Sequence, residues 1–435
     1  MIYALVIISV LAAPVAAFVF LAYAVIRYAP IIGRIFEESP LLMPLRAPAD
    51  PSGETVRFRS TDGIELEGSY FRSRVGPRTG VVVFCHEYLG NRWSAGPYAD
   101  FVRDLGFDVF AFDFRNQGAS ATEPGYKPLQ WVSDREVMDL EGAIAYLKSR
   151  PDADPAGVGL FGISKGGCAA LVAAADEPGV WGVLTDGSFP TRSMVMSYIY
   201  KWAQIYSHTT WRIVPPWVLR MLGWSGRMYS QFRRGCRFPD VERAAARLSP
   251  RPWLMIHGEK DAYVPIDIAR GLFDHAGTPK EFWLVAKAKH NRCREVDPVA
   301  YRDKITEFLA RYGPRRIPVE FLEPELATVG ADLELVASSG SGGELVAACE
   351  SIGELVASSK TADELVAASI RKPIRRNLQT RIESVEESSR DRRASAIDQH
   401  EMKSKAKQPA SITSVGDSTS NLLTSSGHFP APASV

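Results

Sequence analysis

The sequence has few cysteines, and they are not spaced in pairs. Five occur in 435 residues, namely Cys85, Cys168, Cys236, Cys293 and Cys349. An odd number without paired spacing does not indicate a disulfide framework, and none of the spacings is typical of a zinc site. We therefore expect free thiols. Two of them fall on or beside predicted core segments, where a thiol packs as a small apolar group.

An excess of charge of one sign is absent as well. Lysine and arginine number 51 against 50 aspartate and glutamate residues, for a formal net charge of +1. Proteins that bind nucleic acid through phosphate contacts show a basic footprint. We therefore expect no nucleic-acid partner.

Charged side chains are missing altogether from the first 26 residues, which are almost wholly apolar. A helix of this length can span the roughly 30 Å of hydrocarbon in a bilayer. No basic residue precedes the run, and it is longer than the apolar core of most cleavable signals. Small residues around Ala12 to Ala17 leave cleavage as the alternative. We predict a retained transmembrane anchor over residues 1–29.

Basic residues follow this apolar run, at Arg27, Arg34 and Arg46. Basic residues near a membrane span are preferentially kept on the cytoplasmic side. We therefore predict a single-pass membrane protein with its main domain in the cytoplasm, joined to the anchor by a juxtamembrane linker over residues 30–53.

Residues 54–313 alternate strand and helix signals, as expected of a doubly wound α/β domain with a mostly parallel sheet. Strands this apolar belong in a sheet that is covered on both faces. The expected strands are 55–59, 64–71, 81–85, 108–112, 158–161, 181–184, 253–256 and 282–285, and the expected helices include 98–105, 137–147 and 301–312.

The character of the sequence changes after Pro318. Glu-Leu-Val-Ala recurs every ten residues, beginning at Glu334, Glu344, Glu354 and Glu364. Ten residues of helix turn by about 1,000°, so the copies would not share one face. We interpret residues 314–370 as an acidic repeat segment of short frayed helices or a mobile tether, with a partner-binding repeat as the alternative. Residues 371–435, basic and then rich in serine and threonine, are predicted to be a disordered tail with a possible protein or anionic-lipid partner.

One short motif carries most of the chemical information. Gly162-Ile163-Ser164-Lys165-Gly166-Gly167 stands between an apolar strand and a helix poor in bulky side chains. G-x-S-x-G in this context is a nucleophile elbow, in which a strained turn holds the serine hydroxyl clear of the backbone. The glycines are needed because a Cβ there would collide with the neighbouring strand or helix. The motif predicts Ser164 as a nucleophile.

A serine nucleophile needs a base, and the base needs an acid that orients it. Asp261 and His290 each follow a predicted strand, in the chain order expected for this architecture. Active groups in open α/β sheets gather at the carboxyl ends of strands. Asp186 also follows a strand and is the rival for the acid.

These motifs resemble those of the α/β-hydrolase superfamily, in particular its serine-aminopeptidase-like and esterase branch. The resemblance covers residues 54–313 and includes Asp113-Phe-Arg-Asn-Gln-Gly-Ala-Ser120 and the H-G-x-x-D-x-x-V-P stretch that ends at Pro265. It implies Ser164 as the nucleophile, His290 as the base and Asp261 as the acid. His257 is expected to be a packing residue and His86 to shape a loop.

The resemblance also implies an oxyanion hole of two backbone N–H donors, from Lys165 and from the loop that follows residue 85. Relatives usually have His-Gly in that loop, whereas this chain has His86-Glu87, so we expect Tyr88 to be the donor. Glu87 is interpreted either as a buried carboxylate with a partner or as a group that faces a cationic ligand.

An aromatic-rich segment over about 189–246 stands where relatives carry a helical cap. It is predicted to pack a small core of its own, to shape an apolar acyl pocket, or both.

The sequence as a whole favours a membrane-anchored serine hydrolase that cleaves a small-molecule carboxylic ester or acyl thioester through an acyl-serine intermediate, with no metal or organic cofactor. The alternatives are an aminopeptidase-type hydrolase and a catalytically silent interaction platform.

Overall fold

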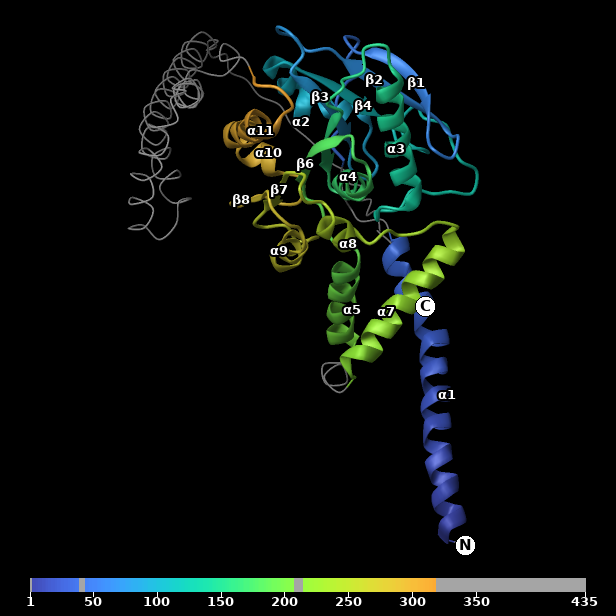
Figure 1. Ribbon diagram of the computed structural model, residues 1–435. Coiled ribbons are helices and arrows are strands. Elements are labelled where there is room, and N and C mark those ends of the chain that lie inside the picture. The colour runs from blue at the N-terminus through green and yellow to red at the C-terminus, as the bar shows by residue number, and fades with distance from the viewer. Residues whose placement is uncertain (1, 39–43, 207–213, 318–435) are drawn as a thin grey trace, which may run out of the picture. The chain divides into compact units, whose positions relative to one another are not determined.

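A computed structural model describes residues 2–38, 44–206 and 214–317. The predicted acidic repeats and the tail lie outside these residues, apart from the first four positions of the repeat segment. The described part is an α/β-hydrolase fold, in which a mostly parallel sheet is covered by helices on both faces, a cap is inserted late in the chain, and an apolar helix precedes the domain (Figure 1).

Eight strands form one sheet in the order β1-β2-β4-β3-β5-β6-β7-β8. The first two strands form the expected hairpin, β2 pairs antiparallel with β4, and the other neighbours are parallel. The strands are β1 (Glu54–Arg59), β2 (Glu65–Phe71), β3 (Gly80–Cys85), β4 (Phe107–Phe112), β5 (Val158–Ile163), β6 (Val180–Asp186), β7 (Trp253–Gly258) and β8 (Lys280–Val285).

The helices fall where the periodicity predicts them, although residues 100–105 form a 3₁₀ helix (η2) and only residues 95–99 before them are α-helical. They are α1 (Ile2–Glu37), η1 (Arg92–Ser94), α2 (Ala95–Ala99), η2 (Asp100–Leu105), α3 (Asp134–Ser149), α4 (Lys165–Asp176), α5 (Arg192–Tyr206), α7 (Pro216–Arg234), α8 (Val241–Ala246), α9 (Ile266–His275), α10 (Cys293–Val296) and α11 (Pro298–Tyr312).

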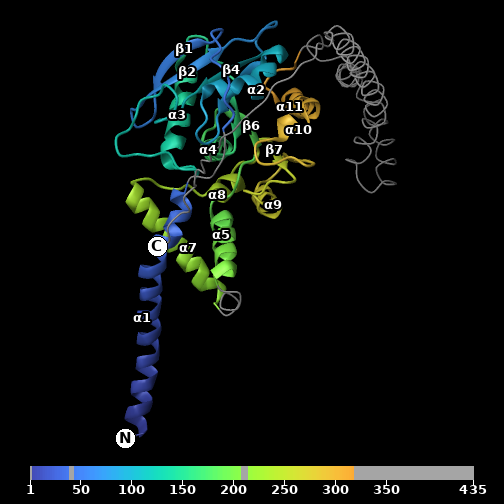
Figure 2. The ribbon, with the colours of Figure 1, turned by 180° about the vertical axis from the view of Figure 1, so that it is seen from behind.

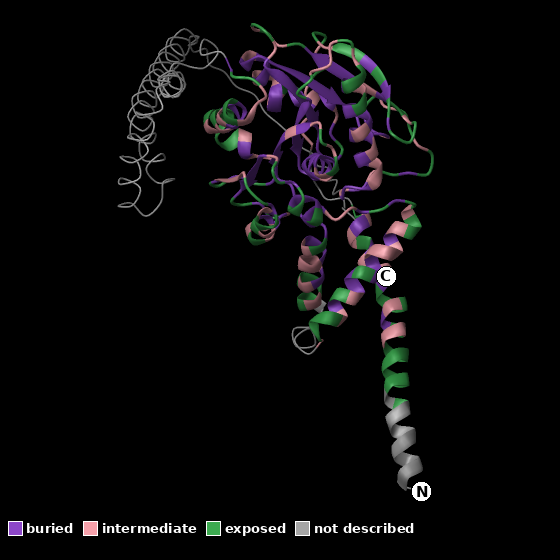
Figure 3. Cartoon of the chain, viewed as in Figure 1, coloured by how far each residue is buried: buried purple, intermediate pink, exposed green. Residues whose placement is uncertain are grey.

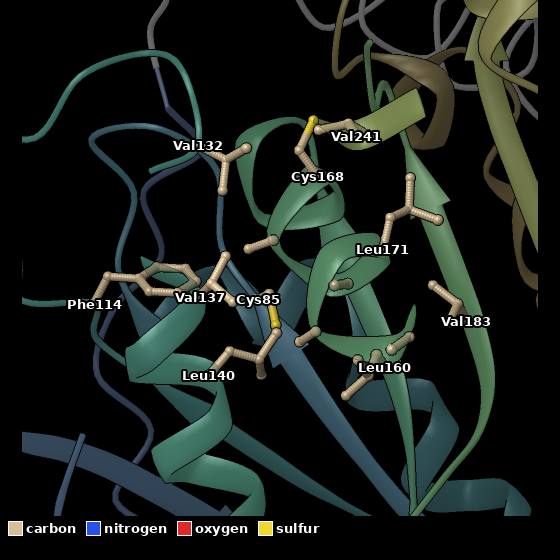
Figure 4. Close-up of a cluster of buried hydrophobic side chains, with 14 of the residues drawn as sticks. Cys85, Phe114, Val132, Val137, Leu140, Leu160, Cys168, Leu171, Val183 and Val241 are labelled. Carbon is tan, nitrogen blue, oxygen red and sulfur yellow. The ribbon is translucent and has the colours of Figure 1, made fainter. Parts of the chain in front are cut away.

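Two buried clusters lie on the two faces of the sheet. One joins the sheet to α3, α4, α8 and the cap, and Figure 4 shows its centre around Cys85, Leu140, Leu160 and Cys168. The other joins the sheet to α2, η2 and α11. The central strands β3, β4 and β5 are buried along their whole length (Figure 3), as expected for a sheet with helices on both faces.

The apolar first helix is longer than the sequence predicts. It passes through Pro30 and ends at Glu37, so residues 30–37 of the predicted juxtamembrane linker are helical. The end of the helix belongs to the core: Phe36 is fully buried and stacks on Phe238 with ring centroids 4.7 Å apart. Burial of such a side chain contributes about 2 kcal/mol or more, which offsets a large part of the roughly 3 kcal/mol that a proline inside a helix costs.

Candidate active site

Ser164 occupies the turn between β5 and α4. Its φ of 51° and ψ of −115° are strained for a residue with a side chain. Its N–H donates to the carbonyl of Asp186 at 2.7 Å, which ties the turn to β6. A Cβ on Gly166 would lie 2.2 Å from the Cys85 carbonyl oxygen, and one on Gly162 would lie 2.5 Å from the backbone of Gly166. The glycines therefore have the close contacts that the motif predicts.

The structure brings Ser164, His290 and Asp261 together from three strand ends. Ser164 Oγ lies 2.9 Å from His290 Nε2, and His290 Nδ1 lies 2.6 Å from Asp261 Oδ2. All three are nearly buried, with 4, 7 and 8 % of their surface exposed. With the Nδ1 proton directed at the carboxylate, Nε2 is left to accept the serine proton.

Asp261 is held as a carboxylate. Its Oδ1 accepts hydrogen bonds from the N–H groups of Tyr263 and Val264 at 2.9 and 2.8 Å. Burial alone would raise its pKa, but the hydrogen bond from His290 and the nearby charge hold the pKa of Asp261 below its ordinary value. An ionised carboxylate can orient the imidazole and stabilise its cation.

Asp186 is not the carboxylate that accepts the hydrogen bond from His290. It ends β6, is fully buried, and its Oδ2 accepts from the Tyr301 hydroxyl at 3.1 Å and from Cys293. Its Oδ1 has no hydrogen-bond partner among the described residues. Burial raises the pKa of Asp186 to about 6. Burial thus disfavours the charged form of Asp186, and its hydrogen bonds come from Tyr301 and Cys293 rather than from His290.

The two other histidines near the site make backbone contacts. His257 Nε2 lies 3.0 Å from the Val264 carbonyl oxygen, and burial lowers the pKa of this imidazole. His86 Nδ1 lies 2.8 Å from the Glu87 carbonyl oxygen, and its Nε2 accepts from the Phe114 N–H at 3.3 Å. Both are held in the packing and loop positions expected of them. No group of three or more His, Cys, Asp or Glu side chains that could hold a metal ion is found in the described part of the chain.

The two expected oxyanion donors follow the carboxyl ends of two neighbouring central strands, Lys165 after β5 and Tyr88 after β3. Lys165 is the first residue of α4, where helical N–H groups are free to bind an anion. The loop after β3 lies against the elbow, and Lys165 Nζ is 5.8 Å from the centroid of the Tyr88 ring. Glu87 is buried and accepts from the Leu45 N–H at 2.7 Å and from Ser94 Oγ at 3.5 Å. Glu87 therefore fits the first of the two interpretations, a buried carboxylate with hydrogen-bond partners. Burial raises the pKa of Glu87.

The Lys165 side chain forms a buried ion pair that the sequence motifs do not predict. It turns inward to Glu136 near the start of α3, with Nζ 2.7 Å from Oε1, and both groups are buried. Glu136 also accepts from the Tyr126 hydroxyl at 2.5 Å and from the Ser133 N–H at 2.9 Å. The Ser133–Glu136 capping box is a recognisable S-x-x-E signal. Nothing in the local sequence indicates that a lysine 29 residues away completes it.

The D-x-R-x-x-G-x-S motif holds the fold together. Asp113 accepts from the Arg92 N–H at 2.7 Å, and the buried Arg115 bonds to Asp139 at 2.6 Å and to Asp62 at 2.7 Å. Ser120 Oγ donates to the Asp113 carbonyl. These charged side chains tie the loop after β4 to the turn between β1 and β2, to η1 and to α3, so the motif supports the site without supplying a reacting group.

Comparison with known proteins agrees with this architecture. Residues 99–313 match the profile of the prolyl oligopeptidase family. The chain is 26 % identical over 267 residues to the protein YfhR of Escherichia coli strain K12, which covers 60 % of this chain and 82 % of that protein. It is 27 % identical over 259 residues to the protein Rv2307c of Mycobacterium tuberculosis strain H37Rv, covering 60 % of this chain and 80 % of the relative. A solved structure of an esterase from Pyrococcus furiosus superposes with a TM-score of 0.46 at 20 % identity and covers 63 % of this chain and 99 % of that one.

The fold, the matched profile and the elbow together define the class of protein. The chain belongs to the α/β-hydrolase superfamily. The profile match supports a hydrolase of the prolyl-oligopeptidase type.

Proposed function

We propose that the protein is a membrane-anchored serine hydrolase that cleaves a carboxylic ester or acyl thioester. The observation that carries this proposal is the pair of short contacts, 2.9 Å from Ser164 Oγ to His290 Nε2 and 2.6 Å from His290 Nδ1 to Asp261 Oδ2. A serine on a strained elbow with this relay behind it is equipped for acyl transfer.

The proposed reaction has two stages. His290 takes the Ser164 proton as Oγ attacks the acyl carbon, and the Lys165 and Tyr88 N–H groups stabilise the oxyanion. The C–O or C–S bond to the leaving group then breaks, and His290 returns the proton to that group. In the second stage water attacks the acyl-serine, with His290 again as base, and free acid and Ser164 are regenerated.

Peptide cleavage is the second candidate, because the matched family profile is that of prolyl oligopeptidases. The same relay serves amide and ester hydrolysis, and the two differ in whether the leaving amine must be protonated. Comparing p-nitrophenyl esters, acyl thioesters and aminoacyl p-nitroanilides on one preparation would discriminate between them.

The anchor belongs to the proposal. The stretch Pro14–Glu37 of α1 is long and apolar enough to cross a membrane by length and composition, and a signal sequence would pass the same test. We propose that it is retained and that Arg27, Arg34 and Arg46 keep the catalytic domain in the cytoplasm.

Fluorophosphonate labelling tests the chemistry. Ser164→Ala is expected to abolish covalent labelling and to lower ester turnover by several orders of magnitude, down to the rate that binding and the oxyanion hole support. Ser149→Ala, an exposed serine at the end of α3, is the matched control and should label fully. Full labelling of a folded Ser164→Ala protein would refute Ser164 as the nucleophile, whereas a folded wild-type protein that does not label would favour the catalytically silent alternative.

A further inference from the structure

The end of the cap farthest from the sheet carries exposed apolar and basic side chains. Ile205 near the end of α5 is 73 % exposed, and Trp217 and Trp224 on α7 are 51 and 63 % exposed. Lys201 and Arg220 are exposed beside them. We call these five residues the distal cap surface. Large apolar side chains gathered in this way mark an interaction site more often than isolated ones do.

The tryptophans form a stripe on one side of α7. Trp217, Arg220 and Trp224 stand at i, i+3 and i+7, which places them on one helical face. The opposite face is buried and packs on α1, where a Cβ on Gly226 would lie 2.4 Å from Ile32 and one on Gly33 would lie 2.8 Å from Tyr229. The exposed stripe is therefore the face of α7 that the packing on α1 leaves uncovered.

The charged side chains of α5 and α7 are all basic. The segments of α5 and α7 contain no aspartate or glutamate and six basic residues. Arg192 pairs with Asp240 at 3.1 Å, and Arg233 and Arg234 pair with Glu37 at 3.7 and 2.7 Å. Lys201 and Arg220 form no ion pair within the described ranges, and both line a surface groove of about 750 Å³. Two uncompensated cations beside exposed tryptophans suit an anionic interface.

The cap helices and the apolar helix project from the same side of the domain. Figures 1 and 2 both show α5 and α7 extending from the sheet toward the N-terminal half of α1. Ala24 is buried although it precedes Arg27, the first charged residue of the chain, so packing around α1 continues into the apolar run. Further toward the N-terminus, Phe18 and Phe20 are 72 and 65 % exposed. If Phe18 and Phe20 lay in the hydrocarbon core of a bilayer, the headgroup region of that bilayer would lie at the level of the distal end of the cap.

We propose that the distal cap surface lies in the headgroup region of the same bilayer that α1 enters. Trp217, Trp224 and Ile205 would occupy the boundary between headgroups and acyl chains, where tryptophan is favoured. Lys201 and Arg220 would meet lipid phosphates, because an anionic leaflet attracts basic side chains near its surface. The proposal rests on anchoring by α1 and deepens the proposed function, since a cap held there takes lipophilic esters from the membrane rather than from water.

Depth-dependent quenching tests the location. A fluorophore on Ile205→Cys, in a Cys349→Ser background, is compared with one on Thr55→Cys, an exposed site on β1. Both full-length proteins are reconstituted into vesicles of phosphatidylcholine and phosphatidylserine that contain brominated lipid. The four cysteines in the described domain are buried and should not compete for the label. We expect strong quenching and a blue-shifted emission at position 205 and neither effect at position 55.

The outcomes separate this proposal from the one on which it rests. Protein that fails to float with the vesicles refutes the anchor, and the cap proposal with it. Protein that floats but shows no quenching at position 205 refutes the cap proposal alone, and indicates that the surface serves a protein partner instead.

Kinetics test the consequence for substrate uptake. Trp217→Ala/Trp224→Ala is expected to lower kcat/KM about tenfold for a long-chain ester embedded in vesicles, since interfacial binding scales with buried apolar area. Turnover of a short, water-soluble p-nitrophenyl ester should be unchanged. Phe232→Ala, which removes an aromatic side chain that is 91 % exposed on the same helix but outside the surface, is the control and should alter neither rate. Unchanged turnover of the embedded ester by the double variant would refute uptake through this surface.

Discussion

The ammonium group of Lys165 lies 2.7 Å from Oε1 of Glu136, and both side chains are buried directly behind the nucleophile elbow. Burial by itself would raise the pKa of Glu136, but the charge of Lys165 and its hydrogen bond hold that pKa below its ordinary value. The pair joins the first residue of α4 to the capping box of α3. The residue that we propose as a backbone donor to the oxyanion is thereby fixed at its side chain.

Removing one partner of this pair should be costly. Lys165→Met leaves the Glu136 carboxylate buried without its cation and is expected to lower the free energy of unfolding by about 3–5 kcal/mol. Urea denaturation of the detergent-solubilised protein measures this change. Lys148→Met removes the exposed pair to Glu177 and should cost no more than about 1 kcal/mol.

A double variant completes this experiment. Lys165→Met/Glu136→Leu removes both charges and should recover much of the lost stability, because no buried charge is then uncompensated. A double variant as unstable as Lys165→Met would show that the pair is not a coupled ion pair.

Asparagine substitutions should separate the two buried aspartates at the site. Asp261→Asn is expected to reduce kcat by about 10⁴ with little change in KM, because the imidazole loses the carboxylate that orients it. Asp186→Asn should change kcat little, since Asp186 bonds to Tyr301 and Cys293. Steady-state kinetics on a p-nitrophenyl ester, with circular dichroism to verify folding, decides the matter. A severe loss in Asp186→Asn and a mild one in Asp261→Asn would reverse the assignment.

Asp186 should also make stability depend on pH. Its folded pKa of about 6 lies above the ordinary value of 3.8. Between these values the unfolded chain has released the proton and the folded chain still binds it, so stability falls as pH rises through this window. The two-unit difference corresponds to about 3 kcal/mol. Asp186→Asn should remove this part of the loss of stability between pH 4 and pH 7. The test is to measure the urea midpoint of each protein at both pH values and to compare how far the midpoint falls. Parallel stability curves for the two proteins would contradict the raised pKa.

Topology can be tested with the same exposed site on β1. Thr55→Cys in the Cys349→Ser background should resist a membrane-impermeant maleimide on intact cells and react after permeabilisation, because the arginines after the apolar run retain the domain inside. The protein should pellet with membranes until detergent is added. Labelling from outside, or a mature N-terminus near Ala17, would place the domain on the other side or show cleavage.

Much of the site could be predicted from the sequence because its signals are local. The elbow needs small residues on both sides of Ser164, and apolar runs mark the strands that end next to Asp261 and His290. A parallel sheet brings the carboxyl ends of its strands to one edge, so order along the chain was enough to nominate the three side chains. The sequence determined the fold class, the proposed nucleophile and a short set of candidate partners.

Choosing between partners required the tertiary structure. Asp186 ends β6 and Asp261 lies in the loop after β7, and only the geometry of that loop places Asp261 2.6 Å from His290 Nδ1. The inward turn of Lys165 depends on Glu136, 29 residues earlier and on another helix. The continuation of α1 through Pro30 to Glu37 depends on packing against Phe238, about two hundred residues away. Local propensity and periodicity carry no information about such distant contacts, because which buried groups meet is decided when the layers pack together.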